Sequence, residues 1–394
     1  MAFHGVDFFD VASLLTEEER AIQDTVRRWV DDAFMPIIND CFLEGRFPLE
    51  LVPKMGELGL LGPTFPTEYG SAGLNSVAYG LIQQELERGD SALRSFASVQ
   101  GSLVMYPIHT FGSEDQKQQW LPRLASGEAI GCFGLTEADY GSNPGGLITT
   151  AREDGDVWVL NGSKMWITNG SLADVAVVWA KTGSLDDSSS IRGFLVPTDT
   201  EGFSASPQTG KLSLQASDTS ELVLEDVRIQ GDCLLPKSDG LKSPLMCLTQ
   251  ARYGIAWGAV GAAMACFDEA VSYAKERVMF DRPIGGFQTQ QIRLAEMLTE
   301  ITKAQLLCLQ LGRLKDRGTF SHTQVSLAKR NNVDMACECA REARRLLGAS
   351  GILAEYQAMR HMANLESVYT YEGTHDIHTL VLGEAITGES AFSG

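Results

Sequence analysis

One carboxylate near the C-terminal end of the chain has neighbours that suit acid–base chemistry. Glu372 lies between Tyr371 and Gly373 in residues 367–378, S-V-Y-T-Y-E-G-T-H-D-I-H. A glycine after the acid permits a turn and the close approach of a flat ligand. An acid beside an aromatic ring in a partly apolar pocket would have a raised pKa, because desolvation disfavours its charged form. Such an acid could act as a general base near neutral pH, although taken alone the string is more typical of an acid on a surface loop.

Two segments in the middle of the chain could line a ligand site. Residues 132–146, C-F-G-L-T-E-A-D-Y-G-S-N-P-G-G, offer backbone amides and the hydroxyls of Thr136 and Ser142 to a polar heterocycle or a phosphate. They form neither a G-x-G-x-x-G motif nor a P-loop. Residues 164–170, K-M-W-I-T-N-G, offer Trp166 as an aromatic wall. Taken singly, the first segment is typical of a turn-rich connection and the second of a core tryptophan.

Two later segments have both a structural and a binding interpretation. Residues 251–262, A-R-Y-G-I-A-W-G-A-V-G-A, carry small side chains that would let a helix pack closely on a partner without any ligand. Residues 276–288 place Arg277, an aromatic residue and Gln288 at a helix–loop–helix join. An arginine and an aromatic ring suit a pyrophosphate and an adenine. A surface salt bridge is the commoner role of such an arginine.

The composition indicates a globular protein and argues against some ligand classes. The chain of 394 residues is long enough for two or three domains or layers. Its net charge of −19 argues against nucleic-acid binding and against a polybasic membrane patch. No signal peptide opens the chain, and we expect no membrane span, because no run approaches about 18 apolar residues. The eight cysteines lack metal-site spacing, so we expect reduced thiols, no bound metal and a cytoplasmic protein.

The periodicity of the chain predicts an α+β protein in which helices precede and follow a β-domain. Residues 1–130 read as an N-terminal helical domain, with capping-box spacing from Thr16 to Glu19. Residues 131–238 read as a small antiparallel β-domain, because short valine- and aromatic-rich runs alternate with polar segments. Residues 239–394 read as a C-terminal helical domain. Four periodic stretches predict a helical bundle there: 252–278, 288–315, 323–347 and 376–387.

The order and spacing of these segments resemble the acyl-CoA dehydrogenase family over nearly the whole chain, and the glutaryl-CoA dehydrogenase subfamily most. The resemblance rests on G-C-F-G-L-T-E, W-I-T-N, A-R-Y-G-I-A-W-G, L-A-E-M-L-T-E-I-T, L-G-R-L-K-D, K-R-N-N and T-Y-E-G-T-H-D-I-H. It implies an N-terminal helical domain, a middle β-domain, a C-terminal four-helix domain, and a homotetramer with one FAD per subunit.

The resemblance also implies a role for individual residues. Glu372 matches the base that removes the α-proton of an acyl-CoA, while the flavin takes the β-hydride. The residues that match the lining of the flavin are Phe133, Leu135, Thr136, Gly141, Ser142, Trp166 and Thr168. Further residues that match FAD contacts are Thr374, Asp376 and Arg345. The segment that would reach the FAD from a neighbouring subunit contains Arg277, Phe280 and Gln288.

A further match concerns the acyl group of the substrate. Residues 91–100, S-A-L-R-S-F-A-S-V-Q, place Arg94 where glutaryl-CoA dehydrogenases bind the distal carboxylate, and Glu87 matches a carboxylate beside it. A guanidinium is a natural clamp for a carboxylate, but a structural ion pair between Glu87 and Arg94 is the alternative. The residues assigned to the substrate are Arg94, Glu87, Ser98, Tyr371 and Arg252. With the clamp, oxidation gives glutaconyl-CoA, and loss of carbon dioxide could follow.

The expected cofactor loops depart from the family pattern at several positions. Asn143 replaces the aspartate of G-S-D, Arg345 stands where many relatives carry glutamine, and Ala349 interrupts the usual G-G-N-G. Asp281 would set a negative charge near the expected pyrophosphate, which is unfavourable unless a neighbouring arginine offsets it. These departures fit a paralogue recruited to a different acyl-CoA.

Three hypotheses about function remain open at this point. The first is a glutaryl-CoA dehydrogenase that passes electrons to an electron-transfer flavoprotein. The second is a flavoenzyme of the same fold that acts on another CoA thioester, such as a ring acyl-CoA in secondary metabolism, with O2 as the acceptor of its electrons. The third is a non-catalytic relative that binds flavin or CoA. Glu372 argues against the third, Arg94 favours the first, and the altered loops favour the second.

Overall fold

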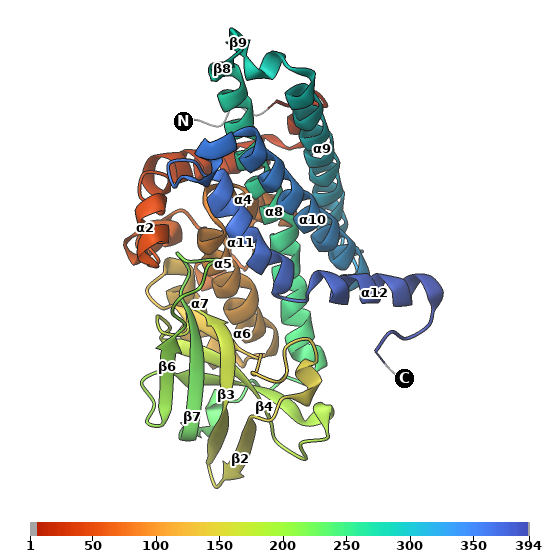
Figure 1. Ribbon diagram of the computed structural model, residues 1–394. Coiled ribbons are helices and arrows are strands. Elements are labelled where there is room, and N and C mark those ends of the chain that lie inside the picture. Colours follow the sequence, from red (N-terminus) through yellow and green to blue (C-terminus); the bar gives the residue numbers. More distant parts are fainter. Residues whose placement is uncertain (1–5, 393–394) are drawn as a thin grey trace.

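The N-terminal helices lie with the C-terminal helices at one end of the molecule, and the β-sheet forms the other end (Figure 1). The computed structural model describes residues 6–392. The N-terminal helices are α1 (Glu17–Trp29), α2 (Ile38–Glu44), α3 (Val52–Glu57), α4 (Ser76–Gly89), α5 (Ser91–Ser98), α6 (Tyr106–Phe111) and α7 (Glu114–Ser126). The predicted capping box is confirmed: the Thr16 hydroxyl accepts the amide of Glu19 at 3.2 Å, and the Glu19 carboxylate accepts the amide of Thr16 at 2.9 Å.

A seven-stranded sheet occupies the middle of the chain. Its strands are β1 (Gly131–Gly134), β2 (Thr150–Asp154), β3 (Val157–Thr168), β4 (Val175–Lys181), β5 (Ile191–Pro197), β6 (Phe203–Pro207) and β7 (Thr219–Gln230). They pair in the order β1-β4-β2-β3-β7-β6, and β5 pairs with β4 off this path. Most pairs are antiparallel, as predicted. β1, however, runs parallel to β4, with Phe133 opposite Val177, because β2 and β3 separate the two strands in the chain and no hairpin joins them.

The C-terminal part is helical as predicted, but it contains one helix that the periodicity did not predict. Its helices are α8 (Lys242–Glu276), α9 (Gln288–Asp316), α10 (His322–Leu346), α11 (Ala358–Thr370) and α12 (His375–Thr387). The missed helix α11 packs on α10 and α8. The predicted stretch 376–387 falls in α12, which buries only His378 and projects from the body (Figure 1). The chain turns away from the bundle because Glu372 and Gly373 both have positive φ angles, 51° and 90°.

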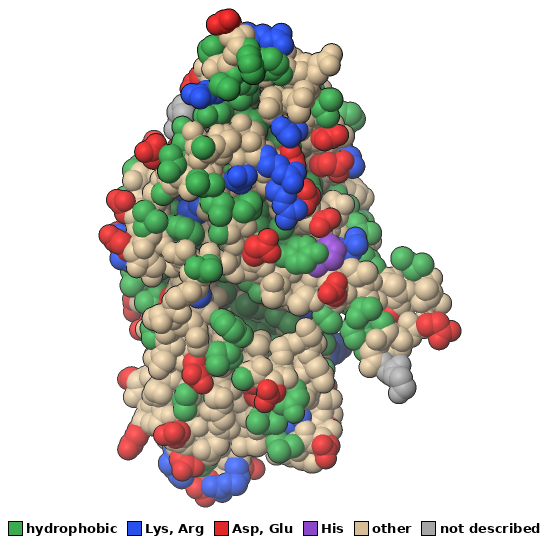
Figure 2. Space-filling model, viewed as in Figure 1, with side chains coloured by type: hydrophobic (Ala, Val, Ile, Leu, Met, Phe, Trp, Pro, Cys, Tyr) green, Lys and Arg blue, Asp and Glu red, His purple; other side chains and the backbone are tan. Residues whose placement is uncertain are grey.

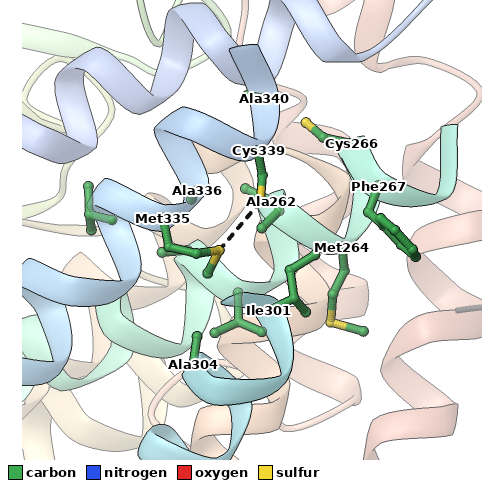
Figure 3. Packing of buried hydrophobic residues seen from close by; sticks show 14 of the residues in the cluster. Ala262, Met264, Cys266, Phe267, Ile301, Ala304, Met335, Ala336, Cys339 and Ala340 are labelled. Carbon is green, nitrogen blue, oxygen red and sulfur yellow. Dashed lines mark hydrogen bonds between the residues drawn. The ribbon is translucent and has the colours of Figure 1, made fainter. Parts of the chain in front are cut away.

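The core of the helical part is built from small and flexible side chains. Ala262 of α8, Ala304 of α9, and Met335 and Ala336 of α10 meet at the centre of the bundle (Figure 3). Alanines let the helix axes approach, and methionine fills irregular gaps. The eight cysteines are all free, and three of them, Cys266, Cys308 and Cys339, are buried in this core.

Helix α8 is the central element of the helical part. It packs against α4 and α10. It alone among the described helices is long and apolar enough to cross a membrane, which corrects the expectation that no stretch comes near this limit. In its apolar window, 83% of the residues are buried inside the protein. Its packing as a core helix therefore accounts for its apolar character.

The small residues in 251–262 have the packing role predicted for them. A Cβ atom added to Gly261 would lie 1.9 Å from the carbonyl oxygen of Gln84 on α4. A Cβ atom added to Gly258 would lie 1.9 Å from Oε2 of Glu87, one turn along α4. Glycine at these positions lets α8 approach α4 and leaves room for a buried carboxylate between them.

Candidate active site

A cavity of about 1960 Å³ opens between the sheet and the helices. Figure 2 shows the hollow between the helical part of the surface and the β part. The predicted site residues that line it are Arg94, Phe133, Leu135, Thr136, Gly141, Ser142, Trp166, Thr168, Arg252, Tyr371, Glu372 and Thr374. The fold thus brings the segments around 94, 136, 166, 252 and 372 to one cavity.

Other predicted residues lie outside this lining. Arg277 and Phe280 are on the exposed hairpin of β8 (Val278–Met279) and β9 (Arg282–Pro283), at the end of the helical part that is remote from the sheet (Figure 1). Phe280 is 85% exposed, and Gln288 begins α9 close by. No side chain of this group reaches the cavity of its own chain, so its predicted contact with the cofactor of a neighbouring subunit stays a prediction.

The remaining residues of the prediction lie near the cavity or on the surface. Arg345 is exposed on α10 and pairs with Glu342, which is the surface salt bridge of a helix and no part of the cavity. Asp376 is exposed in the first turn of α12. Glu87 and Ser98 are fully buried behind Arg94.

Glu372 lies in the loop between α11 and α12, and its side chain faces the cavity. Its Oε2 atom is buried and has no hydrogen-bond partner among the described residues. Burial raises the pKa of Glu372, and the positive charges of Arg94, Lys329 and Arg252 limit the rise. The predicted raised pKa is therefore confirmed in direction and cause. An unpaired carboxylate of raised pKa at a cavity wall can accept a proton from a bound ligand.

Arg252, predicted to bind the substrate, also holds the loop that carries Glu372. Its Nε donates to the carbonyl oxygen of Glu372 at 2.7 Å. A Cβ atom added to Gly373 would lie 3.1 Å from its terminal nitrogen, so only glycine fits beside it without adjustment. The sequence reasoning missed a second cation at this loop, Lys329 of α10. The signal for it was present in the K-R-N-N motif, residues 329–332.

Arg94 forms the polar end of the cavity and is only 1% exposed. Its Nε donates to Oε2 of Glu87 at 2.7 Å, and its Nη2 donates to the hydroxyl of Tyr371. Burial alone would lower the pKa of Arg94, but the Glu87 carboxylate holds this pKa above its usual value, so the guanidinium stays charged. Arg94 therefore makes the buried ion pair of the alternative interpretation and also faces the cavity, while its role as a clamp for a carboxylate stays a prediction.

Several donors at this polar end have no partner. No described residue accepts a hydrogen bond from Nη1 of Arg94. The buried hydroxyl of Ser95, which also lines the cavity, makes no hydrogen bond of good geometry with a described residue, and its nearest polar neighbour is Tyr371. Buried polar groups without partners are rare in folded proteins, because each costs free energy. A group of such donors around a charged guanidinium fits a ligand that brings an anionic oxygen to this end.

The wall of the cavity formed by the sheet suits a planar heterocycle. Trp166 lines this wall with a φ of 64° and remains 61% exposed, which is unusual for a large aromatic side chain. The backbone of the neighbouring loop is held by a hydrogen bond of 2.8 Å from the amide of Met165 to the carbonyl oxygen of Thr136. The same loop is also held by a buried salt bridge, in which Nζ of Lys164 lies 2.8 Å from Oε1 of Glu137. A flat aromatic surface with hydroxyl groups nearby fits a flavin ring.

Comparisons with known proteins agree with this arrangement. The family models for the N-terminal, middle and C-terminal domains of acyl-CoA dehydrogenase match residues 16–128, 132–227 and 238–387. The chain is 38% identical over 369 residues to the mitochondrial short-chain specific acyl-CoA dehydrogenase of Bos taurus, covering 93% of this chain and 90% of the relative. The chain therefore belongs to the acyl-CoA dehydrogenase family, the flavin-dependent oxidoreductases that act on acyl-CoA thioesters.

Two solved structures are more similar in sequence to this chain than the bovine relative is. A glutaryl-CoA dehydrogenase from Mycobacterium smegmatis superposes with a TM-score of 0.94 at 56% identity, covering 97% of each chain. A second glutaryl-CoA dehydrogenase from this organism, in complex with FADH2, superposes with a TM-score of 0.95 at 53% identity, covering 98% of each chain. The expected fold and the expected family are thus confirmed, while the named substrates of these proteins differ from that of the bovine relative.

The close approach of α8 to α4 gives a first testable prediction. We expect Gly258→Ala to lower the free energy of unfolding by about 1–3 kcal/mol, because the new methyl group would displace the Glu87 carboxylate from its pocket. Chemical denaturation followed by circular dichroism measures this loss. Gly383→Ala on α12 is the matched control, since a Cβ there meets nothing within 4 Å. Equal stability of the two variants would contradict the packing argument.

Proposed function

We propose that the protein is an FAD-dependent dehydrogenase of a dicarboxylyl-CoA, with glutaryl-CoA as the best candidate. The observation that carries this choice is the buried Arg94, whose Nη1 has no partner among the described residues, beside the buried hydroxyl of Ser95 in the same cavity as Glu372. A plain acyl chain would leave these donors unsatisfied, whereas a distal carboxylate would accept from them. The similarity to two proteins named glutaryl-CoA dehydrogenase supports the choice.

The FAD fits the wall formed by Trp166, Thr136, Ser142 and Thr168, which offers a flat aromatic surface and several hydroxyl donors. Bound there, FAD would supply the acceptor for the hydride that leaves the β-carbon of the acyl group. The adjoining turn carries Asn143, which also lines the cavity where the family pattern has aspartate.

The residues of the chain would divide the remaining work. Glu372 would take the α-proton of the thioester on its unpaired Oε2. Arg94 would hold the distal carboxylate and so fix how deeply the acyl chain enters the cavity. Tyr371 would orient Arg94 through its hydroxyl. The dicarboxylyl product could then lose carbon dioxide, because the dienolate left behind can hold the electron pair.

We further propose that the site is completed between subunits. Arg277, Phe280 and Gln288 are exposed and lie far from the cavity of their own chain. These residues can therefore contact only an FAD that is bound in a neighbouring copy of the chain, as in the expected homotetramer. An electron-transfer flavoprotein is the proposed acceptor, and O2 is the alternative acceptor.

Anaerobic addition of glutaryl-CoA to the purified flavoprotein tests the proposal. We expect the flavin absorbance to bleach promptly, and release of carbon dioxide would add decarboxylation. Butyryl-CoA should bleach the flavin much more slowly, because it leaves the donors around Arg94 unpaired. Slow recovery in air supports a dehydrogenase, and fast recovery with formation of an oxygenated product favours the O2-using alternative. A protein that holds FAD but responds equally to both thioesters would overturn the dicarboxylyl assignment.

A further inference from the structure

The loop between α11 and α12 is held by two cations that bind three successive carbonyl oxygens. Lys329 of α10 donates from Nζ to the carbonyl oxygen of Tyr371, and to that of Gly373 at 2.6 Å. Arg252 of α8 donates to the carbonyl oxygen between them, that of Glu372, at 2.7 Å. Every backbone acceptor from 371 to 373 therefore points at a cation.

This arrangement explains an unfavourable backbone conformation. Glu372 has a φ of 51°, a left-handed conformation that is uncommon for residues other than glycine. Such a conformation persists only where the surroundings hold it. The carbonyl oxygen of Tyr371 belongs to the peptide group before Glu372, and Lys329 holds it. The carbonyl oxygen of Glu372 belongs to the peptide group after it, and Arg252 holds that one. Lys329 also holds the next peptide group, through Gly373. The carboxylate is thereby aimed into the cavity rather than toward solvent.

Neither an ion pair nor exposure to water explains the position of Lys329. Lys329 is 1% exposed, and its two recorded hydrogen bonds go to backbone carbonyls. Its Nζ also lies 5.7 Å from the centroid of the Tyr371 ring, and Cζ of Arg94 lies 5.4 Å from the same centroid. A buried lysine is costly, because burial disfavours its charged form. We therefore take its contacts with the loop as the reason for its buried position.

We infer that Lys329 is a positioning residue for the reaction: it holds the loop that carries Glu372 so that the carboxylate faces the acyl group. The inference rests on the proposed role of Glu372 as the base. Nothing in it depends on which acyl group is bound, because Lys329 contacts the backbone and the aromatic ring of Tyr371 but does not line the cavity.

The charges around Glu372 determine the expected pH dependence. Burial raises the pKa of Glu372, and Arg94, Lys329 and Arg252 lower it. His378 of α12 also faces the loop, but burial lowers its pKa to about 2, so it is neutral. The groups that face Glu372 from the surrounding elements are Tyr79, Arg94, Arg252, Lys329, Tyr371 and His378. Burial lowers the pKa of Lys329 itself, and the Glu372 carboxylate opposes this fall, so each group favours the charged form of the other. Replacing Lys329 removes this interaction, so the pKa of the base should rise.

Lys329→Met tests the inference, because methionine has a similar length but neither charge nor donors. We expect anaerobic flavin reduction by glutaryl-CoA and by butyryl-CoA to slow about a hundred-fold, since the base is misplaced. We also expect the acid limb of the pH–rate profile to move up by about one pH unit or more. Arg330→Gln is the matched control, because its Nε binds Thr379 of α12 at 2.7 Å instead of the loop.

The experiment separates a positioning role from a general loss of structure. A merely structural lysine would lower the amount of active holoenzyme but leave the pH profile in place, and that result would overturn the inference. If Lys329→Met does not yield folded flavoprotein, Lys329→Gln keeps an amide donor. Lys329→Gln should reduce its flavin more slowly than the wild type and should show the shifted acid limb. A wild-type rate and a wild-type pH profile in this variant would overturn the inference.

Two further measurements keep this inference distinct from the proposed function. A crystal structure of the Lys329→Met holoenzyme should show residue 372 outside the left-handed region, and an unchanged loop would contradict the positioning role. Glu372→Gln is measured in parallel with the same two thioesters. If that variant is still reduced normally, the proposed base is wrong. If it is inactive while Lys329→Met keeps the wild-type rate and profile, only the inference about Lys329 fails.

Discussion

Glu372→Gln should leave the protein yellow but stop the substrate from bleaching its flavin. Glutamine has the shape of glutamate, so the fold and the FAD wall should persist, but an amide cannot accept the α-proton. General bases of this kind contribute about 10²–10⁴-fold to a rate, and we expect the loss to lie at the upper end, because no other carboxylate of the proposed machinery faces the thioester. Anaerobic stopped-flow absorbance at the flavin band, with glutaryl-CoA in excess, measures the effect.

The control for this prediction removes a carboxylate from a neighbouring helix. Glu338 of α10 is exposed and pairs with Arg341 in the same helix, away from the loop. Glu338→Gln should reduce its flavin at the wild-type rate. Normal bleaching in Glu372→Gln would remove this residue from the mechanism and would leave the raised pKa of Glu372 as a consequence of burial alone.

The second large effect concerns the choice of substrate. Replacing Arg94 and Glu87 together by glutamine should abolish the preference for glutaryl-CoA over butyryl-CoA. Both partners are changed because removing Arg94 alone would leave the buried Glu87 carboxylate without its cation, which is strongly destabilising. The double variant also loses the pair between Arg94 and the distal carboxylate of glutaryl-CoA. Loss of a buried, hydrogen-bonded charge pair costs about 2–5 kcal/mol, so kcat/KM for glutaryl-CoA should fall by a factor of about 30 or more. The value for butyryl-CoA should change little.

A single substitution provides the comparison. Glu87→Gln keeps the Arg94 guanidinium, and Ser91, which donates to Oε1 of Glu87 at 2.7 Å, can still bind the amide oxygen. We expect this variant to retain its preference for the dicarboxylyl thioester. Equal losses for both thioesters in the double variant would return Arg94 to a purely structural role in the contact between α4 and α5.

Local patterns in the sequence carried much of the fold. The capping box at Thr16, a mostly antiparallel sheet within 131–238 and the helices α8, α9 and α10 all appear where they were predicted. These features depend on residues a few positions apart, which is the range over which caps, helical faces and strand alternation act. The order of helices, sheet and helices follows directly from them.

Features that depend on distant residues were predicted less well. The parallel pairing of β1 with β4 needs a partner some 44 positions away, and nothing local in Gly131–Gly134 indicates its direction. Helix α11 was missed, and its burial depends on its packing against α10 and α8, which lie far from it in the sequence. The left-handed backbone of Glu372 was not predicted either, because it is a conformation that its residue type disfavours.

The sequence by itself determined the class of the protein, the candidate base and the candidate clamp, because motifs around Glu372 and Arg94 are short and contiguous. Only the tertiary structure decided what these residues can do. It set the unpaired carboxylate of Glu372 in the same cavity as the unpaired donors around Arg94, and it drew Lys329 and Arg252 from two other helices onto one loop. Burial and electrostatic contact act through space, so a pKa, an unpaired donor or a clamped backbone exists only once distant segments have packed together.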